Sequence, residues 1–136
     1  MTNFDWDKAL LALTLWREAR GEIVDAKKAV GCCIRNRVRN PRWWGTDYSS
    51  VMTKRWQFSS LTAAGDPNLI QWPNPIDTAW QACMQIADDV YNDVLVDTTN
   101  GATSYYDKSL DGNPPTWATD GSLAHKCDIG NFHFFG

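Results

Sequence analysis

The sequence predicts a mainly helical α+β domain, with three main helices followed by a small C-terminal β element. Three segments show the helical spacing of apolar residues, and the last third of the chain changes to threonine, glycine, proline and aromatic residues. The chain has 136 residues, 43% hydrophobic and 12% aromatic, which is enough apolar surface for one core without metal or disulfide staples. We therefore expect residues 1–136 to form a single domain.

The first predicted helix runs from about Asp5 to Arg20. Asn3 or Thr2 is its possible cap, and Gly21 is its natural end. Its apolar residues fall on two roughly opposite lines. The lines are Leu11, Leu15, Glu18 and Glu22, and Trp6, Ala9, Leu10, Leu13 and Trp16. A helix with two apolar sides is normally buried.

The string WREARGE, at the end of this helix, contains the only two glutamates of the chain, Glu18 and Glu22, whereas the other 14 acidic residues are aspartates. If the helix continues through the string, their spacing of one turn places both carboxylates on one face. A carboxyl in line with Leu11 and Leu15 is partly removed from water, which raises its pKa. Glu18 is therefore a candidate general acid.

The second predicted helix spans about Asp25 to Arg39 and is closed by Asn40 and Pro41. Its stripe comprises Ala26, Ala29, Val30, Cys33 and Ile34. The tight link around Gly21 predicts that the first two helices pack as a hairpin or corner.

Periodicity weakens between Arg42 and Pro73, which indicates loops with one short helical turn from Ser49 to Lys54. In the third main helix, Asn74 is the expected N-cap, and Pro75 is expected in the first turn. Its stripe comprises Ile76, Ala79, Trp80, Cys83, Ala87, Val90, Tyr91 and Val94. Further on, residues 102–106 and 129–135 are expected to pair as short strands.

Charge and hydropathy exclude some classes of protein. Net charge is −3, but residues 1–56 hold 11 basic and 6 acidic residues, against 2 and 10 in residues 57–136. The basic residues of residues 1–56 could bind an anionic polymer such as nucleic acid or the bacterial wall. Alternatively, they form a basic helix face exposed to solvent. They match no nucleic-acid readout motif, so no nucleic-acid partner is expected. The longest apolar run, Ala9–Trp16, is far below the ~20 residues of a bilayer span, so no membrane insertion is expected.

Cysteine and histidine usage predicts neither a metal nor a cofactor. Buried free thiols are expected at Cys32, Cys33, Cys83 and Cys127, which show no CxxC spacing. The chain has two histidines without ligand spacing. His125 has no partner in sequence and is expected at the surface, whereas His133 is expected to pack among aromatic residues.

Six strings, read in order, resemble those of the SleB-type cell wall hydrolase domain: WREARGE, AKKAVGCCIRNRV, QFSS, NGATSYY, PPTW and IGNFHFF. The resemblance covers nearly the whole chain. It implies a lysozyme-like, mostly helical fold and an enzyme that cuts the glycan strand of peptidoglycan, as spore-cortex lytic enzymes and phage lysins do. It assigns the catalytic glutamate to Glu18. His133 departs from the pattern, because the family usually has its histidine one place earlier.

Cleavage of a glycosidic bond needs an acid and usually a second carboxylate about 5 to 9.5 Å away. Glu22 is the obvious partner, but it could instead bind Arg17, Arg20 or turn backbone, so we expect it to be structural or orienting. Without a second carboxylate, Glu18 acts as acid and then base while the sugar's 6-hydroxyl or acetamido group closes onto the anomeric carbon. The resemblance favours this lytic transglycosylase route. A muramidase that hydrolyses the same bond stays open, with Asp107 as the remaining carboxylate.

Other residues are predicted to bind or orient the substrate. Gln57 and Ser59 offer an amide and a hydroxyl to sugar groups, with Phe58 as a core anchor. Tyr105 and Tyr106 alternate in a strand, and one of them, with Tyr105 preferred, orients the acid or contacts the acetamido group. Five tryptophans in irregular segments could stack on sugars, although most are expected in the core: Trp43, Trp44, Trp56, Trp72 and Trp117. Among these tryptophans, Trp117, in the string PPTW, agrees best with the family pattern.

The expected partner is the glycan strand of peptidoglycan, bound by a monomer. The start of the chain lacks the pattern of a secretory signal, so synthesis in the cytoplasm and action on the bacterial wall as a phage endolysin are expected. Spore-associated and housekeeping roles stay open. One rival is a glycan-binding module without catalysis. Another is an amidase or peptidase, which needs zinc or Cys127 near His125 or His133.

Overall fold

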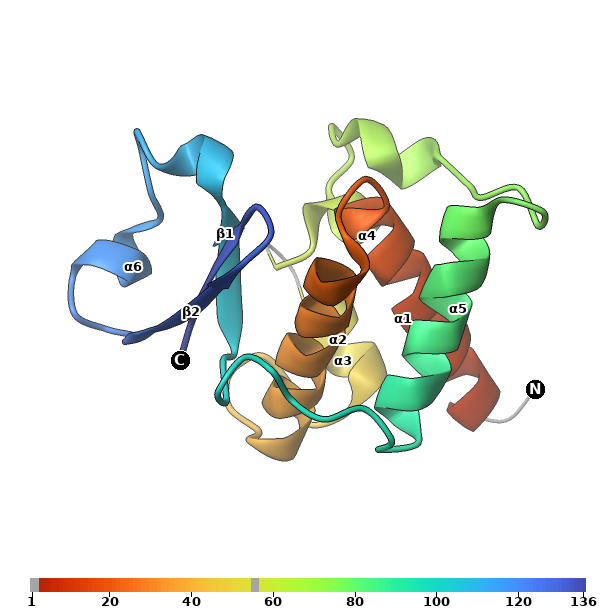
Figure 1. Ribbon diagram of the computed structural model, residues 1–136, viewed down its shortest axis with the longest axis horizontal. Helices are drawn as coiled ribbons and strands as arrows, with labels where there is room; N and C mark the ends of the chain where they lie inside the picture. Colours follow the sequence, from red (N-terminus) through yellow and green to blue (C-terminus); the bar gives the residue numbers. More distant parts are fainter. Residues whose placement is uncertain (1–2, 55–56) are drawn as a thin grey trace.

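A computed structural model describes residues 3–54 and 57–136, so Thr2 and Trp56 lie outside the described residues. The helical lobe contains α1 (Asn3–Ala19), α2 (Val24–Arg39), α3 (Tyr48–Thr53), α4 (Ser59–Thr62), the 3₁₀ turn η1 (Pro67–Ile70) and α5 (Thr78–Tyr91). The smaller lobe contains β1 (Ser104–Asp107), η2 (Lys108–Leu110), α6 (Thr116–Thr119), β2 (His125–Ile129) and β3 (Phe132–Phe135). Figure 1 shows the two lobes side by side. The mainly helical α+β class is confirmed.

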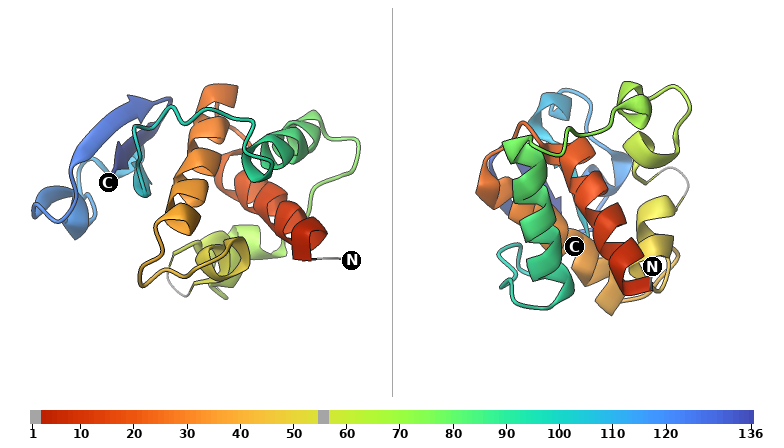
Figure 2. Two further views of the ribbon diagram at one scale, coloured as in Figure 1. Left: turned by 90° about the horizontal axis from the view of Figure 1, so that it is seen from below. Right: turned by 90° about the vertical axis from the view of Figure 1, so that its right-hand side faces the viewer.

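Helix α1 is the centre of the helical lobe. It packs against α5 on one side and against α3 on the other, as Figure 2 shows. Leu11 and Leu15 have no exposed surface, because their line faces the core. The helix ends at Ala19, before Gly21. Glu22 therefore lies beyond the helix, so the condition under which both carboxylates would share one helical face is not met.

Helix α2 lies between α1, α5 and the sheet. Its predicted stripe, Ala26, Ala29, Val30, Cys33 and Ile34, is buried. A Cβ added at Gly31 would lie 2.9 Å from Cγ2 of Val90, so glycine allows the close approach of α5. The observed bounds differ from the predicted ones by one residue at the start.

Helix α5 begins later than predicted. The side chain of Asp77, not that of Asn74, caps it by accepting from the Ala79 N–H. Asn74 instead closes a local turn by accepting from the Ile76 N–H. Ile76 is 78% exposed, and Val94, beyond the helix, is 70% exposed. The predicted stripe is therefore too long at both ends, although its middle packs on α1 and α2.

The predicted strand pairing is confirmed, within a sheet of order β1-β3-β2. Tyr105 pairs with Phe134, and Tyr106 pairs with His133, in an antiparallel register. Strand β2, which the sequence did not predict, completes a hairpin with β3. Tyr105 and fully buried Phe134 lie on the inner face, toward the helices, whereas Tyr106 and His133 lie on the outer face.

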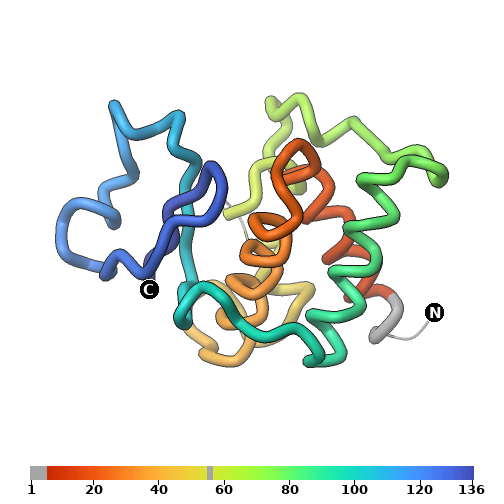
Figure 3. Tube along the Cα trace, viewed as in Figure 1, coloured from red at the N-terminus to blue at the C-terminus, as the bar shows by residue number. Residues whose placement is uncertain are grey.

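The segment between α5 and β1 crosses the C-terminal part of α2 and joins the lobes, as the trace in Figure 3 shows. The side-chain amide of Asn36 donates to Oδ2 of Asp97 (3.0 Å) and to the carbonyl of Ala102 (2.9 Å). These bonds attach the start of the sheet to α2. Among the described residues, no helix is long and apolar enough to cross a bilayer.

Candidate active site

Glu18 occupies the last turn of α1, at the junction of the two lobes. Its carboxyl is held largely away from water. Burial raises its pKa, the nearby Ser60 and Tyr105 hydroxyls lower it, the negative charge of Asp66 raises it, and the net effect is a rise. A carboxyl with a raised pKa keeps its proton at a higher pH than an exposed glutamate does. This is the condition that general acid catalysis requires.

Tyr105 connects the sheet to this carboxyl. Its hydroxyl donates to Oε1 of Glu18 at 3.0 Å. Burial and the nearby Glu18 charge raise the pKa of Tyr105 well above its usual value, so the phenol stays protonated and remains a donor. The ring is fixed by edge contacts with Phe132, at 5.1 Å between centroids, and by Phe134 at 5.8 Å. The contact predicted for Tyr105 is therefore present.

Two residues that the sequence did not single out lie near Glu18. The Ser60 hydroxyl is buried and lowers the pKa of the carboxyl, yet Oγ completes no hydrogen bond with any described residue. Asp66 raises the pKa of the same carboxyl through its charge. The two carboxylate oxygens of Asp66 accept from the Ser59 hydroxyl (2.7 Å) and from the Asn68 N–H (2.8 Å).

Arg17 fixes the loop that carries Ser60. It is 6% exposed, and its Nη1 donates to the carbonyl of Ser60 at 3.0 Å. Its Nε donates to the carbonyl of Gln71 at 3.2 Å, and its guanidinium lies over the Trp72 ring, 4.7 Å from the centroid. Arg17 therefore binds this loop and the 71–72 segment to the end of α1, beside the candidate acid.

Gln57 and Trp117 come together, as the prediction of a binding region requires. They line a pocket of about 230 Å³ between the lobes. The other lining residues are Arg37, Arg42, Trp43, Trp44, Ser104, Ser122 and Leu123. Gln57 Oε1 also accepts from Nη1 of Arg37 at 3.1 Å, which fixes the amide at the pocket wall. Amide, guanidinium and indole groups are suited to a sugar with polar edges and an apolar face.

Three other predicted site residues do not contact Glu18. Glu22 accepts from Nδ2 of Asn131 at 3.1 Å, in the turn between β2 and β3, while Arg17 and Arg20 reach other groups. Ser59 is exposed and donates to Asp66. Tyr106 stacks on Phe135 on the outer face, at 5.9 Å between centroids. Separately, the carboxylate of Asp107 caps η2 by accepting from the Ser109 N–H.

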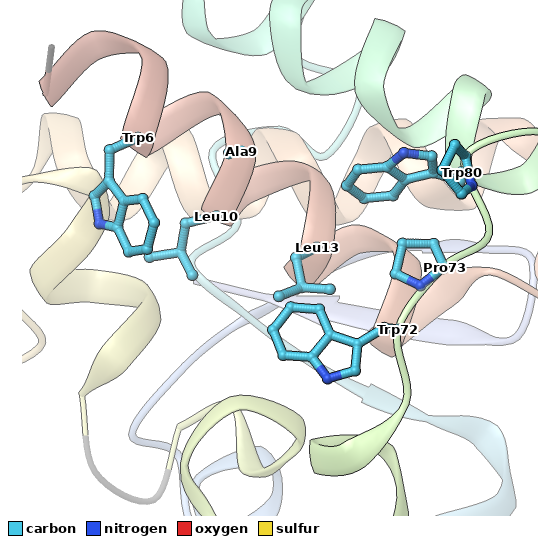
Figure 4. A pocket seen from close by; sticks show the side chains of 8 residues that line it. Trp6, Ala9, Leu10, Leu13, Trp72, Pro73 and Trp80 are labelled. Carbon is cyan, nitrogen blue, oxygen red and sulfur yellow. The ribbon is translucent and has the colours of Figure 1, made fainter. Parts of the chain in front are cut away.

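The tryptophans divide between core and surface. Trp44 is 3% exposed, whereas Trp43 is 60% and Trp72 71% exposed. Trp72 belongs to a second pocket of about 450 Å³ on the other apolar line of α1 (Figure 4). Its lining residues are Trp6, Ala9, Leu10, Leu13, Trp72, Pro73, Pro75 and Trp80. None of them carries an ionisable group, so this larger hollow cannot supply the acid, and Glu18 remains the candidate centre.

The contacts around the cysteines do not favour a cysteine nucleophile. Cys32, Cys33 and Cys83 are buried free thiols, as predicted, and Cys127 is a half-buried one. Cys127 pairs with Phe134 on the inner face, whereas His133 points to the outer face. Burial raises the pKa of the Cys127 thiol, which opposes thiolate formation.

The two histidines lie where the sequence predicts. His125 is exposed at the surface, and His133 packs against the Tyr106 ring, at 5.0 Å between centroids. Both also contact one carboxylate: Nε2 of His125 lies 2.7 Å from Oδ1 of Asp128, and Nδ1 of His133 lies 2.6 Å from the same oxygen. Sequence spacing does not predict this cluster, because it depends on the hairpin of β2 and β3.

Comparisons with known proteins identify the family and the fold. The model of a family described as Cell Wall Hydrolase matches residues 21–135. The catalytic domain of the germination-specific lytic transglycosylase SleB from Bacillus anthracis is similar in structure, with a TM-score of 0.72 and 21% identity over 100% of this chain and 97% of that chain. The catalytic domain of the Bacillus cereus SleB protein gives a TM-score of 0.71 and 23% identity over 96% and 89%. The search of curated proteins gave no match.

Proposed function

The chain belongs to the cell wall hydrolase family, and from this premise we propose that it cleaves the β-1,4 bond between MurNAc and GlcNAc in peptidoglycan, with Glu18 as acid and base. One observation carries the proposal. The Glu18 carboxyl is largely buried at the junction of the lobes, its pKa is raised, and Tyr105 holds one of its oxygens. A positioned, protonated carboxyl is the group that glycosidic bond cleavage needs first.

The chemistry follows from this carboxyl. Tyr105 occupies Oε1 of Glu18, so the proton to be transferred sits on Oε2. Glu18 gives that proton to the glycosidic oxygen, and the bond between this oxygen and the anomeric carbon breaks. The Glu18 carboxylate then takes the proton of the sugar's 6-hydroxyl, whose oxygen bonds to the anomeric carbon. The product is a 1,6-anhydro end, and Glu18 regains its proton.

This route is favoured over hydrolysis because each candidate for a second carboxylate already accepts a hydrogen bond from a group other than Glu18. Glu22 is bound by Asn131, and Asp107 caps η2. Asp66, which acts on Glu18 through its charge, accepts two hydrogen bonds from its own loop. One of the similar structures is described as a lytic transglycosylase. Hydrolysis of the same bond, with Asp66 orienting a water, is the second candidate because Asp66 is the carboxylate that affects the pKa of Glu18.

Digestion of purified murein sacculi followed by mass spectrometry tests the proposal. We expect muropeptides with anhydro ends from the parent chain, and a loss of about 10²- to 10⁴-fold in rate for Glu18→Gln. Glu22→Gln is the matched control, since it makes the same change in the same string and should keep most of the activity. Muropeptides with reducing ends would indicate that the bond is hydrolysed. Free stem peptides, or a Glu18→Gln protein as active as the parent, would contradict the proposal.

A role as a phage endolysin, acting as a monomer, is a finer proposal that follows from the resemblance to phage lysins. Expression in a bacterial host, with and without a membrane permeabiliser, tests it. Lysis that depends on the permeabiliser supports delivery through a separate pore, and equal lysis under both conditions contradicts it. Sedimentation of the purified chain tests the monomer.

A further inference from the structure

The outer face of the β2–β3 hairpin carries both histidines of the chain. Asp128 and His133 are direct partners across the strands, so their side chains share a face. In a regular strand His125, three residues before Asp128, would point to the opposite face. The register shifts between His125 and Cys127, and this irregularity returns His125 to the face of Asp128.

We propose that His125, Asp128 and His133 form a binding site for a transition-metal dication of the zinc type. One ligand atom from each residue, imidazole nitrogen or carboxylate oxygen, lies within 4.8 Å of the others. Ligands of a tetrahedral zinc ion, at about 2.0–2.2 Å from the metal, are roughly 3.4 Å apart. The three donor atoms therefore need only small side-chain rotations to surround one ion.

Asp111 supplies an independent feature of a built site. Its Oδ1 lies 2.9 Å from Nε2 of His133, while Nδ1 of the same ring faces Asp128. Metal-binding histidines commonly give their other ring N–H to a carboxylate, which fixes the ring orientation and strengthens the ligand. Asp111 comes from the loop after η2, so a separate segment of the chain orients His133 toward the site.

Accessibility also fits a metal site. The side chain of His133 is 18% exposed, whereas those of His125 and Asp128 are 50% and 44% exposed. An ion can therefore enter from solvent, while His133 is fixed between Tyr106, at 5.0 Å between ring centroids, and Asp111. Further coordination positions remain open to water.

The ligand set selects the class of metal. Imidazole nitrogen suits zinc, copper and nickel, whereas calcium and magnesium take oxygen ligands. Two imidazoles with one carboxylate therefore favour a first-row transition metal over the hard cations. The site lies on the face of the sheet opposite Tyr105 and Glu18, so it is separate from the proposed cleavage chemistry.

Isothermal titration of the metal-free chain with zinc tests the site, and cobalt(II) absorption reports the coordination. We expect one zinc per chain, with binding at least tenfold weaker in His125→Gln and in Asp128→Asn, and about 10- to 100-fold weaker in Asp111→Asn. Cys127→Ser is the matched control, because this possible ligand lies on the other face of the same strand, and its zinc binding should be unchanged.

Circular dichroism shows which variants keep the parent fold, and only those are compared. The proposal is overturned if the folded parent shows no saturable zinc binding, or if His125→Gln and Asp128→Asn bind zinc as the parent does. It is also overturned if Cys127→Ser abolishes binding, or if excess calcium displaces the zinc. These outcomes leave the proposed glycan cleavage untouched, since none of these residues lies at Glu18.

Discussion

The two faces of the three-stranded sheet place adjacent residues in opposite environments. Tyr105 lies on the inner face, where its hydroxyl meets Glu18 and its ring is fixed by buried phenylalanines. Tyr106, one residue later, stacks on Phe135 and packs at a tilt against His133 at the outer face. The period of two along a strand thus separates the buried contact between Tyr105 and Glu18 from a polar cluster open to solvent.

The difference between the two faces shows that only one face of the sheet contributes to the environment of Glu18 in the helical lobe. The inner face lowers the polarity around Glu18 and contributes one hydroxyl to it, while the outer face adds no contact to that carboxyl. Changes on the inner face should therefore affect stability and catalysis together. Changes on the outer face that keep the aromatic rings packed against Trp117 should affect neither strongly.

The largest effect is expected from emptying the inner face. Phe134 has no exposed surface, so Phe134→Ala removes a whole ring from the core and should lower the free energy of unfolding by about 3–5 kcal/mol. Tyr106→Ala on the outer face should cost clearly less, because its ring is partly in water. Urea unfolding followed by tryptophan fluorescence measures both. Equal losses would show that the two faces are not energetically distinct.

A smaller change on the same face should act more on catalysis than on stability. Tyr105→Phe keeps the ring but removes the hydroxyl that donates to Glu18. After Glu18 has given up its proton, this bond has a charged partner and is worth about 1.5–3 kcal/mol. We expect a roughly 10- to 100-fold lower rate on sacculi. Tyr106→Phe is the matched control on the outer face and should keep the parent rate. A parent-like rate for Tyr105→Phe would remove Tyr105 from the site.

The turn that joins β2 and β3 is shared by both faces. Gly130 has a φ of +57°, and a Cβ there would lie 3.0 Å from Cβ of Ala26. Gly130→Ala should therefore cost about 1–2 kcal/mol of stability, because left-handed backbone is unfavourable for alanine. Gly112→Ala is the control, since a Cβ at Gly112 meets nothing within 4 Å. Thermal unfolding compares the two, and an equal effect would contradict the strain argument.

The same asymmetry explains what the sequence could predict. The buried helices were located to within a few residues, because apolar spacing records a buried face directly. Strand β2 was missed because it carries His125, Lys126 and Asp128, and its only sign is the pairing with β3. The start of α5 was misplaced because Asn74 and Asp77 are both good caps, and only packing decides between them.

The site was predicted in part for a similar reason. The contact between Glu18 and Tyr105 was anticipated because Glu18 stands in a helix that carries one of only two glutamates, in a string that resembles the family motif, and Tyr105 stands in a strand. Ser60 was missed by one residue in favour of Ser59, because α4 is a single short turn whose orientation no periodicity defines. Asp66 comes from a loop, and its charge reaches Glu18 only through the folded arrangement. Loop residues therefore need coordinates before they can be assigned.

The smallest effect concerns the pH dependence of the proposed acid. The protonated form of Glu18 starts the reaction, so the rate should fall as pH rises through its pKa. The charge of Asp66 raises that pKa, so Asp66→Asn should lower it and move the alkaline limb of the rate profile to lower pH. Ser60→Ala should move the limb to higher pH, because the Ser60 hydroxyl lowers the pKa.

If Asp66→Asn and Ser60→Ala shift the alkaline limb in opposite directions, Glu18 is the titrating group. A general destabilisation of this region would shift the alkaline limb of both variants in the same direction. Rates on sacculi across the pH range, at constant ionic strength, measure the shift. Asp128→Asn on the outer face changes the same kind of charge and should leave the limb in place. If the alkaline limb moves in Asp128→Asn but not in Asp66→Asn, the titrating group lies near the outer face of the sheet and is not Glu18.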